Sequence, residues 1–160
     1  MIAVVQRVRE ASVFVEDDGY KARIRRGLCV LLAVEVGDTE AEADWMAHKL
    51  VNMRIFPDRD DKMNRSLLDL SGEMLLVSQF TLAGDTARGN RPSFASAADP
   101  DLGSHLYRRV AEQVRREHGV RVRTGVFGAR MLVQIANDGP VTVIVEKRAI
   151  ERRPDEAPKG

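Results

Sequence analysis

Short runs in which hydrophobic and polar residues alternate make up much of the chain, a pattern typical of β-strands. Alternation predicts strands over residues 2–8 and 11–16, and the segment Glu16–Gly19 supplies turn residues after the second. The continuous apolar run over residues 28–34 predicts a strand that is buried on both faces. By the same criteria, further strands are expected over residues 73–82, 120–124, 131–136 and 141–147.

Two other stretches carry the apolar spacing of amphipathic helices. In residues 39–53 the apolar side chains recur three or four positions apart, and Thr39 and Glu42 have the spacing of a capping box. Residues 99–118 show the same helical spacing. They begin with Asp99–Pro100, which suit the N-cap and the first turn of a helix, and a glycine follows the expected last turn. The sequence therefore predicts two helices, separated by one strand and a polar, glycine-containing stretch.

This order of elements predicts a single α+β (mixed α/β) domain with a mixed, partly barrel-like β-sheet and two main helices packed on one face. A length of 160 residues suits one domain, and we expect it to span residues 1–147. Residues 148–160 are highly charged and almost free of apolar side chains, so we expect a disordered tail. The sheet face without helices would need cover, which predicts a homodimer.

The charge balance narrows the possible partners. Lys and Arg number 25 against 24 Asp and Glu, a net charge of +1. A broad groove for long nucleic acid is therefore not expected, although a few local contacts could still read one end of a nucleic acid. Residues 108–123 contain six Arg and two Glu, and this segment is either a solvated face or a modest phosphate contact.

The inventory of reactive side chains is small. Three His residues without metal-ligand spacing and a single cysteine, Cys29, in an apolar run give no reason to expect a metal or a cofactor. The opening residues are too short and polar for a signal peptide, and the longest apolar run is far below the roughly 20 residues of a membrane span. We expect a cytoplasmic protein with no membrane partner.

Two stretches are not explained by folding alone. In Ser78–Leu82, polar residues close a strand whose preceding run, Met74–Val77, is wholly apolar. Because buried polar groups are costly without partners, this pattern suggests a site at the end of the strand, unless Ser78 and Thr81 cap a turn. The second stretch, Asn137–Thr142, is by default a hairpin turn with a trans Gly-Pro bond; a cis bond would make it a rigid element that exposes its carbonyl groups.

The sequence resembles the bacterial and eukaryotic D-aminoacyl-tRNA deacylases, the D-tyrosyl-tRNA deacylase family, from residue 1 to about 147. Four stretches in this order carry the resemblance, and their combination is highly specific. The tail from residue 148 onwards has no recognised counterpart. The four stretches are Val4–Val8 with Ala11–Val13, Ser78–Leu82, Gly89–Phe94 and Asn137–Thr142.

The resemblance implies a homodimeric hydrolase that cleaves the ester between a D-amino acid and the 3′-terminal adenosine of tRNA, a proofreading step of translation. It implies that Gly139–Pro140 is cis and enters the partner subunit's active site as a chirality filter. The strand from Ser78 would supply the wall of the substrate pocket and the main-chain donors that face it, and Arg7 would hold the Gly-Pro element in orientation.

Such a filter follows a simple logic. An enzyme that accepts many D-amino acids cannot recognise them by their side chains. It must instead bind the amino and carbonyl groups and occupy the space into which an L side chain would project. A rigid main-chain wall does this without side-chain preference. Because glycine has no Cβ, the wall cannot exclude it, and we expect some activity on glycyl-tRNA, including glycine mischarged on tRNA-Ala.

Two mechanisms are compatible with these residues. Thr81 could act as a nucleophile, but its hydroxyl needs a base and none is adjacent in the sequence. We favour the second mechanism, in which the main-chain N–H groups of Gln79 and Phe80 stabilise the oxyanion and the 2′-hydroxyl of the substrate helps to activate water. Phe80 would either stack on the terminal adenine or belong to the core.

Two other functions remain open from the sequence. One is a sibling deacylase that acts on L-alanyl-tRNA and lacks the strict chiral filter. The other is a non-catalytic module that binds the end of a tRNA through the arginines of residues 108–123. The motifs at Ser78–Leu82 and Asn137–Thr142 favour the D-specific enzyme.

Overall fold

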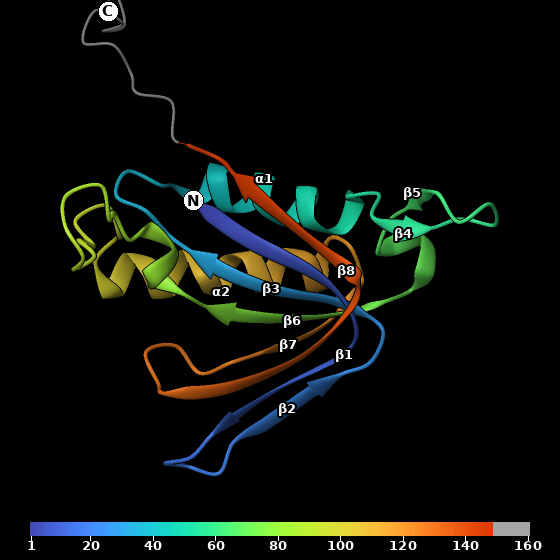
Figure 1. Ribbon diagram of the computed structural model, residues 1–160, viewed down its shortest axis with the longest axis horizontal. Helices are drawn as coiled ribbons and strands as arrows, with labels where there is room; N and C mark the ends of the chain where they lie inside the picture. The colour runs from blue at the N-terminus through green and yellow to red at the C-terminus, as the bar shows by residue number, and fades with distance from the viewer. Residues whose placement is uncertain (149–160) are drawn as a thin grey trace, which may run out of the picture.

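A computed structural model describes residues 1–148, so the predicted tail lies, apart from Arg148, outside the described residues. Both predicted helices are present, and the strands form one large sheet with a small hairpin beside it (Figure 1). The elements are β1 (Ile2–Val15), β2 (Lys21–Ile24), β3 (Gly27–Ala33), α1 (Glu40–Asn52), β4 (Phe56–Pro57), β5 (Met63–Arg65), the 3₁₀ helix η1 (Leu68–Leu70), β6 (Glu73–Ser78), the 3₁₀ helix η2 (Phe80–Ala83), α2 (Pro100–Arg116), β7 (Arg121–Thr124) and β8 (Met131–Glu146).

The main sheet is mixed, as predicted. Its strands follow the order β2-β1-β3-β6-β7, and β8 pairs with β1. The pairs that involve β1 are antiparallel, whereas β3–β6 and β6–β7 are parallel. Because β3 and β6 are parallel neighbours, the end of β6 at Ser78 lies level with Leu32 near the end of β3.

Two predicted breaks in strands are wrong. Residues 2–15 form one strand, because β1 pairs first with β3 through residues 2–8 and then with β2 through residues 11–14, so its polar middle marks a change of partner. Residues 131–146 also form one strand rather than a hairpin, since β8 pairs with β1 on both sides of Gly139. Between these paired segments, the four residues Asp138–Val141 of β8 stand opposite Arg7 alone, which makes a large bulge.

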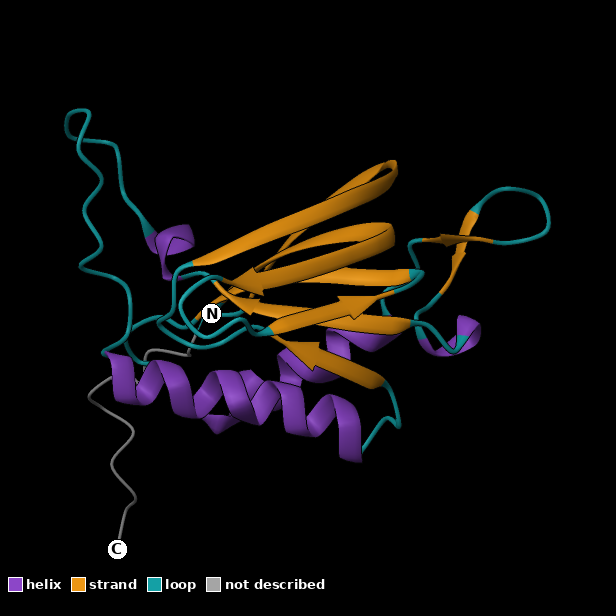
Figure 2. Cartoon of the chain, turned by 90° about the horizontal axis from the view of Figure 1, so that it is seen from below, coloured by secondary structure: helices purple, strands orange, loops and turns teal. Residues whose placement is uncertain are grey.

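Local sequence signals set the ends of the two helices. Thr39 and Glu42 form the predicted capping box at the start of α1, and Asp99 accepts hydrogen bonds from the N–H groups of Asp101 and Leu102 at the start of α2. Both helices pack on one face of the sheet (Figure 2). Their apolar sides meet the sheet in a core that includes Met46, Leu50, Leu106, Val110, Val30 and Leu76. No helix within residues 1–148 has the length and apolar character needed to cross a membrane.

The opposite face of the sheet is covered by the chain itself. The sheet curls so that β2 approaches β6 and β7, which confirms the partly barrel-like shape. A second core fills the curl with Val8, Val13, Ile24, Cys29, Leu75 and Val77. The expectation that this face needs a partner for cover is therefore wrong, and the homodimer stays a prediction that must rest on other grounds.

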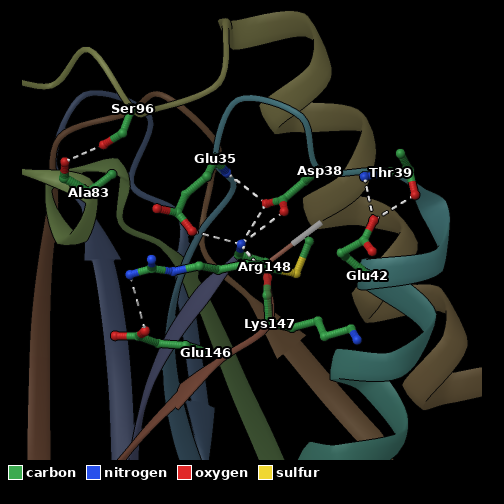
Figure 3. A network of polar contacts seen from close by, with 10 residues as sticks. Glu35, Asp38, Thr39, Glu42, Ala83, Ser96, Glu146, Lys147 and Arg148 are labelled. Carbon is green, nitrogen blue, oxygen red and sulfur yellow. Dashed lines mark hydrogen bonds and ion pairs between the residues drawn. The ribbon is translucent and has the colours of Figure 1, made fainter. Parts of the chain in front are cut away.

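A buried charge network joins the first residue to the end of β8 (Figure 3). The α-ammonium group of Met1 donates to the carboxylates of Glu35 and Asp38 at 2.8 and 2.9 Å, and to the main-chain oxygen of Lys147 at 2.8 Å. Burial raises the pKa of the Asp38 carboxyl, and the hydrogen bond from the ammonium opposes this rise. The segment that holds Glu35 also pairs with Ala97, so the network supports one wall of the site described next.

Candidate active site

A pocket of about 490 Å³ opens where β6 ends. The buried run Met74–Val77 leads to Ser78, and the chain then turns into η2 instead of continuing as a strand to residue 82 as predicted. The structure thus places the end of this strand in the wall of a hollow, as the polar residues that close it suggested. This hollow, the β6 pocket, is lined by Val77–Phe80, Ala97, Ala98, Pro100, Phe127–Ala129, Met131 and Val133.

The main-chain donors of this segment differ by one residue from those we expected. The N–H of Gln79 donates to the main-chain oxygen of Leu32 at 2.8 Å and is therefore occupied. Phe80 and Thr81 begin η2, and within residues 1–148 no group accepts from their N–H groups. The first N–H groups of a helical turn lack partners in the turn itself, which is why this pair is free.

The surroundings of Thr81 contain no base. Its side chain is exposed, and its hydroxyl accepts a hydrogen bond from the side-chain amide of Gln79. Among the described residues, no carboxylate, imidazole or amine bonds to this hydroxyl, and Thr81 does not line the β6 pocket. An amide that donates to a hydroxyl cannot take its proton, so no described group of one chain would activate Thr81 as a nucleophile.

Phe80 lies at the mouth of the pocket rather than in the core. It is 59% exposed, so the alternative interpretation as a core aromatic is wrong. Its ring meets that of Phe94 edge to face, with centroids 5.2 Å apart. Phe94 ends the motif Gly89–Phe94, so the structure brings two of the four resembling stretches together at one place.

The Gly139–Pro140 peptide bond is cis, so the default expectation of a trans hairpin turn is wrong. Both residues are exposed, within the bulge of β8. Asn137 closes the bulge, since its side-chain oxygen accepts from the N–H of Val141 at 2.8 Å and its amide donates to Thr142 at 3.1 Å. The bulge is therefore a hydrogen-bonded turn that presents Gly139 and Pro140 to the outside.

Arg7 holds this turn against β1 through hydrogen bonds. Its side chain is only 12% exposed, and its Nε donates to the main-chain oxygen of Asp138 at 2.9 Å while Nη1 donates to that of Ile55 at 2.8 Å. A Cβ at Gly139 would lie 3.1 Å from Nη2 of Arg7 and 2.7 Å from a methyl group of Val141. The turn therefore fits against Arg7 with room only for glycine.

Within one chain, the Gly-Pro turn and the end of β6 lie at opposite ends of the sheet (Figure 1). Arg7 pairs with Leu28, which pairs with Met74 near the start of β6, whereas Ser78 is level with Leu32. Four residues of strand separate the two levels, about 13 Å. In the pairing order of the sheet, β1 and β3 lie between β8, which carries the turn, and β6. One copy of the chain does not bring these two motifs into a single site.

The comparisons with known proteins decide the family. The sequence model of a family described as D-Tyr-tRNA(Tyr) deacylase matches residues 4–146. The chain belongs to this family. It is therefore an enzyme, a hydrolase of the deacylase type.

Similar proteins agree with this assignment. D-aminoacyl-tRNA deacylases of Syntrophomonas wolfei and Thermotoga petrophila are 51% and 53% identical to the chain, covering 94% and 91% of it and 99% and 97% of themselves. Among solved structures, a c-Myc DNA unwinding element binding protein has a TM-score of 0.86 at 41% identity, covering 93% of this chain and all of its own. A probable eukaryotic D-amino acid tRNA deacylase shares the fold, with a TM-score of 0.79 at 21% identity over 90% and 97% of the two chains.

Neither a metal-type cluster nor a reactive cysteine is found among the described residues. Within residues 1–148 no three His, Cys, Asp or Glu residues gather as a metal site. Burial raises the pKa of the Cys29 thiol to about 12, so the cysteine is an inert member of the second core.

Sequence reasoning missed one part of the lining of the β6 pocket. Phe127–Ala129 lie in the connection between β7 and β8, Met131 begins β8, and these residues line the same pocket as Phe80. The available signal was a phenylalanine between Gly125 and Gly128 in a loop, a large apolar residue with no strand or helix to bury it.

Proposed function

We propose that this deacylase hydrolyses the ester bond between a D-amino acid and the 3′-terminal adenosine of tRNA, and spares L-aminoacyl-tRNA. The observation that carries the proposal is the β6 pocket, which Phe80 lines, together with the free N–H groups of Phe80 and Thr81 at the start of η2, directly after the buried strand. Family membership and about 50% identity to proteins named D-aminoacyl-tRNA deacylase support the same activity. A tRNA substrate fits the cytoplasmic location expected from the sequence.

The proposed chemistry uses the backbone. The carbonyl oxygen of the ester accepts from the N–H groups of Phe80 and Thr81, which stabilise the negative charge that develops when water attacks the carbonyl carbon. The 2′-hydroxyl of the terminal ribose helps to remove the proton from the water. The bond between the carbonyl carbon and the ribose 3′ oxygen then breaks, and that oxygen takes a proton, which gives free amino acid and tRNA.

The walls of the pocket suit the adenosine end of the substrate. Ser78 and Gln79 supply polar groups at the end of the strand, while Phe80 and Phe127 add aromatic rings to the lining. A base stacked on an aromatic ring gains about 1–3 kcal/mol without sequence preference. The terminal adenine is therefore proposed to stack on one of these rings, with the ester directed toward η2.

Chiral selection is proposed to come from a second copy of the chain. The turn Gly139–Pro140 is exposed and braced by Arg7, yet it lies at the far end of the sheet from its own β6 pocket. A homodimer in which each turn enters the partner's pocket gives the turn a role as a filter. The turn would block the direction of an L side chain and leave space for a D side chain, and glycine would pass because it has no side chain.

The test is a panel of matched substrates: D-tyrosyl-, L-tyrosyl-, glycyl- and L-alanyl-tRNA. Fast release from D-tyrosyl-tRNA, some release from glycyl-tRNA and none above the spontaneous rate from L-tyrosyl-tRNA are expected. Preferred hydrolysis of L-alanyl-tRNA would instead support the sibling deacylase without a strict filter. Binding of all four without turnover would support a tRNA-end-binding module and refute the proposed hydrolysis.

A further inference from the structure

A second hollow lies beside the β6 pocket. Its volume is about 460 Å³, and Phe127 lines both hollows, so they are neighbours. A Cβ at Gly103 of α2 would come within 3.2 Å of the Phe127 ring, which therefore rests directly on the helix. This hollow, the α2 groove, is lined by Tyr20, Tyr107, Arg108, Ala111, Glu112, Arg115 and Thr124–Phe127.

Two arginines give the α2 groove its charge. Arg108 and Arg115 are exposed, and within residues 1–148 neither forms an ion pair. Their neighbour Arg109 on the same helix is bound instead to Glu40 and Asp44, and Arg121 is bound to Glu73. The arginine-rich segment thus divides into arginines with structural partners and arginines whose charge is available to a ligand.

Arg115 is held in place for such a ligand. Its Nε and Nη2 donate to the main-chain oxygen of Val122 at 3.4 and 3.1 Å, and its Nη1 has no acceptor among the described residues. Across the groove, the hydroxyl of Tyr20 donates to the main-chain oxygen of Thr124 at 2.9 Å. A guanidinium fixed by the main chain loses less entropy when it binds an anion.

The two arginines lie in line with the β6 pocket. Arg108 and Arg115 are seven residues apart on α2, about two turns, so they share one face at a separation of about 10 Å. Pro100, which lines the β6 pocket, lies about 12 Å before Arg108 along the same helix. An extended ligand that leaves the β6 pocket past Phe127 would therefore reach Arg108 first and Arg115 next.

We infer that the α2 groove binds the sugar–phosphate backbone of the unpaired nucleotides that precede the terminal adenosine of the RNA substrate, with Arg108 and Arg115 contacting phosphates. The inference rests on the proposed function, which places that adenosine in the β6 pocket. Guanidinium groups match phosphate oxygens in geometry and charge. Two arginines without ion-pair partners suit contacts with a few phosphates at the end of an RNA. The net charge of +1 does not favour binding along a longer stretch of nucleic acid.

Binding of an uncharged RNA tests the groove without requiring catalysis. The probe is a fluorescent hairpin of a tRNA acceptor stem with its unpaired 3′ end, titrated at several salt concentrations. Arg108→Ala should weaken binding about tenfold and reduce the slope of log affinity against log salt by about 0.7. Glu112→Gln, which removes the one negative charge that lines the groove, should strengthen binding.

Arg115→Gln should weaken binding in the same direction as Arg108→Ala, with the melting temperature measured because Arg115 also bonds to Val122. The matched control is Arg59→Ala, since Arg59 is an exposed arginine in the β4–β5 connection, and its affinity should equal that of the wild type. Unchanged affinity and salt slope in Arg108→Ala would overturn the inference.

Activity separates the groove from the proposed function. In Arg108→Ala, KM for D-tyrosyl-tRNA should rise about tenfold with kcat unchanged, while hydrolysis of D-tyrosyl-adenosine, which has no phosphates, stays at the wild-type rate. An equal loss on both substrates would overturn the inference. A wild type that binds the hairpin with this arginine dependence but hydrolyses neither ester would refute the proposed function and support the groove.

Discussion

The Nε atom of Arg7 on β1 donates a 2.9 Å hydrogen bond to the main-chain oxygen of Asp138 on β8, the residue before Gly139. The same guanidinium reaches Ile55 through Nη1, so one buried side chain fixes the bulge of β8 to two other parts of the chain. Arg7 therefore fixes the exposed Gly-Pro turn to the rest of the chain, while Asn137 closes the turn from within.

Removal of this brace should impair the filter. Arg7→Ala is expected to lower kcat/KM for D-tyrosyl-tRNA about 100-fold and to reduce the preference for D- over L-tyrosyl-tRNA, because in the proposed homodimer a misplaced turn would no longer fit the partner's pocket. Arg7→Lys should not rescue either quantity, since one ammonium cannot hold two carbonyl groups in the geometry of a guanidinium. The hydrolysis rates of both variants on matched D- and L-tyrosyl-tRNA give kcat/KM and the preference for the D substrate.

The matched control for this variant is Arg9→Ala. Arg9 contacts the Asp138 carboxylate at 3.3 Å, but its side chain is 82% exposed, and such ion pairs contribute little. Its kinetics should be close to those of the wild type. Equal effects of the two substitutions would show that Arg7 has no special role in holding the turn.

Thr81→Ala should retain most of the activity. The substitution removes the hydroxyl but keeps the main-chain N–H that we propose as an oxyanion donor, so kcat for D-tyrosyl-tRNA is expected to fall by less than about tenfold. A fall of three or more orders of magnitude would identify the hydroxyl as the nucleophile. Single-turnover kinetics at saturating enzyme provide the measurement.

Two variants that fail for different reasons should restore activity when combined. Ala129→Trp fills the β6 pocket, and Gly139→Val disrupts the turn, so each homodimer should be inactive. In a heterodimer, the intact pocket of one chain would receive the intact turn of the other. An equal mixture, unfolded and refolded together, should recover about a quarter of the wild-type activity.

One outcome of the refolding experiment would contradict a site shared between two chains. If each site were built within one chain, no heterodimer would contain an intact site and the mixture would stay inactive. Melting temperatures of the two single variants show whether each one folds.

Local signals in the sequence were sufficient to predict where the two helices begin. Thr39 with Glu42, and Asp99 with Pro100, set the helix starts through contacts within one turn, so their positions could be predicted. The polar residues after Met74–Val77 marked the β6 pocket for a similar reason, since a buried apolar run that ends in polar groups needs partners for them.

Other features depend on contacts between distant residues. The N–H of Gln79 is occupied by Leu32, 47 positions earlier, and only the pairing of β3 with β6 reveals this. The continuity of β8 through Gly139 depends on β1 pairing with it on both sides of Arg7. The curl of the sheet, which covers its second face, likewise follows from the twist and pairing of six strands.

The capping box predicts a pH dependence of stability. A hydrogen bond from the Thr39 hydroxyl is the main cause that lowers the pKa of Glu42 below its ordinary value of 4.5. A lowered pKa in the folded state contributes stability that is full above the ordinary value and is lost as the pH falls through the lowered one. Glu42→Gln should therefore cost stability at pH 7 and little at pH 2.

Urea unfolding of the wild type and Glu42→Gln at both pH values measures this difference, and Thr39→Ala should cost about 1 kcal/mol at pH 7. Glu117→Gln serves as the control, because Glu117 is exposed just after α2 and no hydrogen bond holds its side chain among the described residues. An equal loss in Glu42→Gln at both pH values would show that the ionised carboxylate is not what the cap requires.

The ratio of single-turnover hydrolysis rates on D-tyrosyl-tRNA and L-tyrosyl-tRNA tests the central claim most directly. The two substrates share the same tRNA and the same side chain, so only the configuration at Cα differs. A backbone site with a chiral wall predicts release of D-tyrosine at least about 1,000 times faster than release of L-tyrosine. Equal rates on the two substrates, or no release above the spontaneous rate, would contradict it.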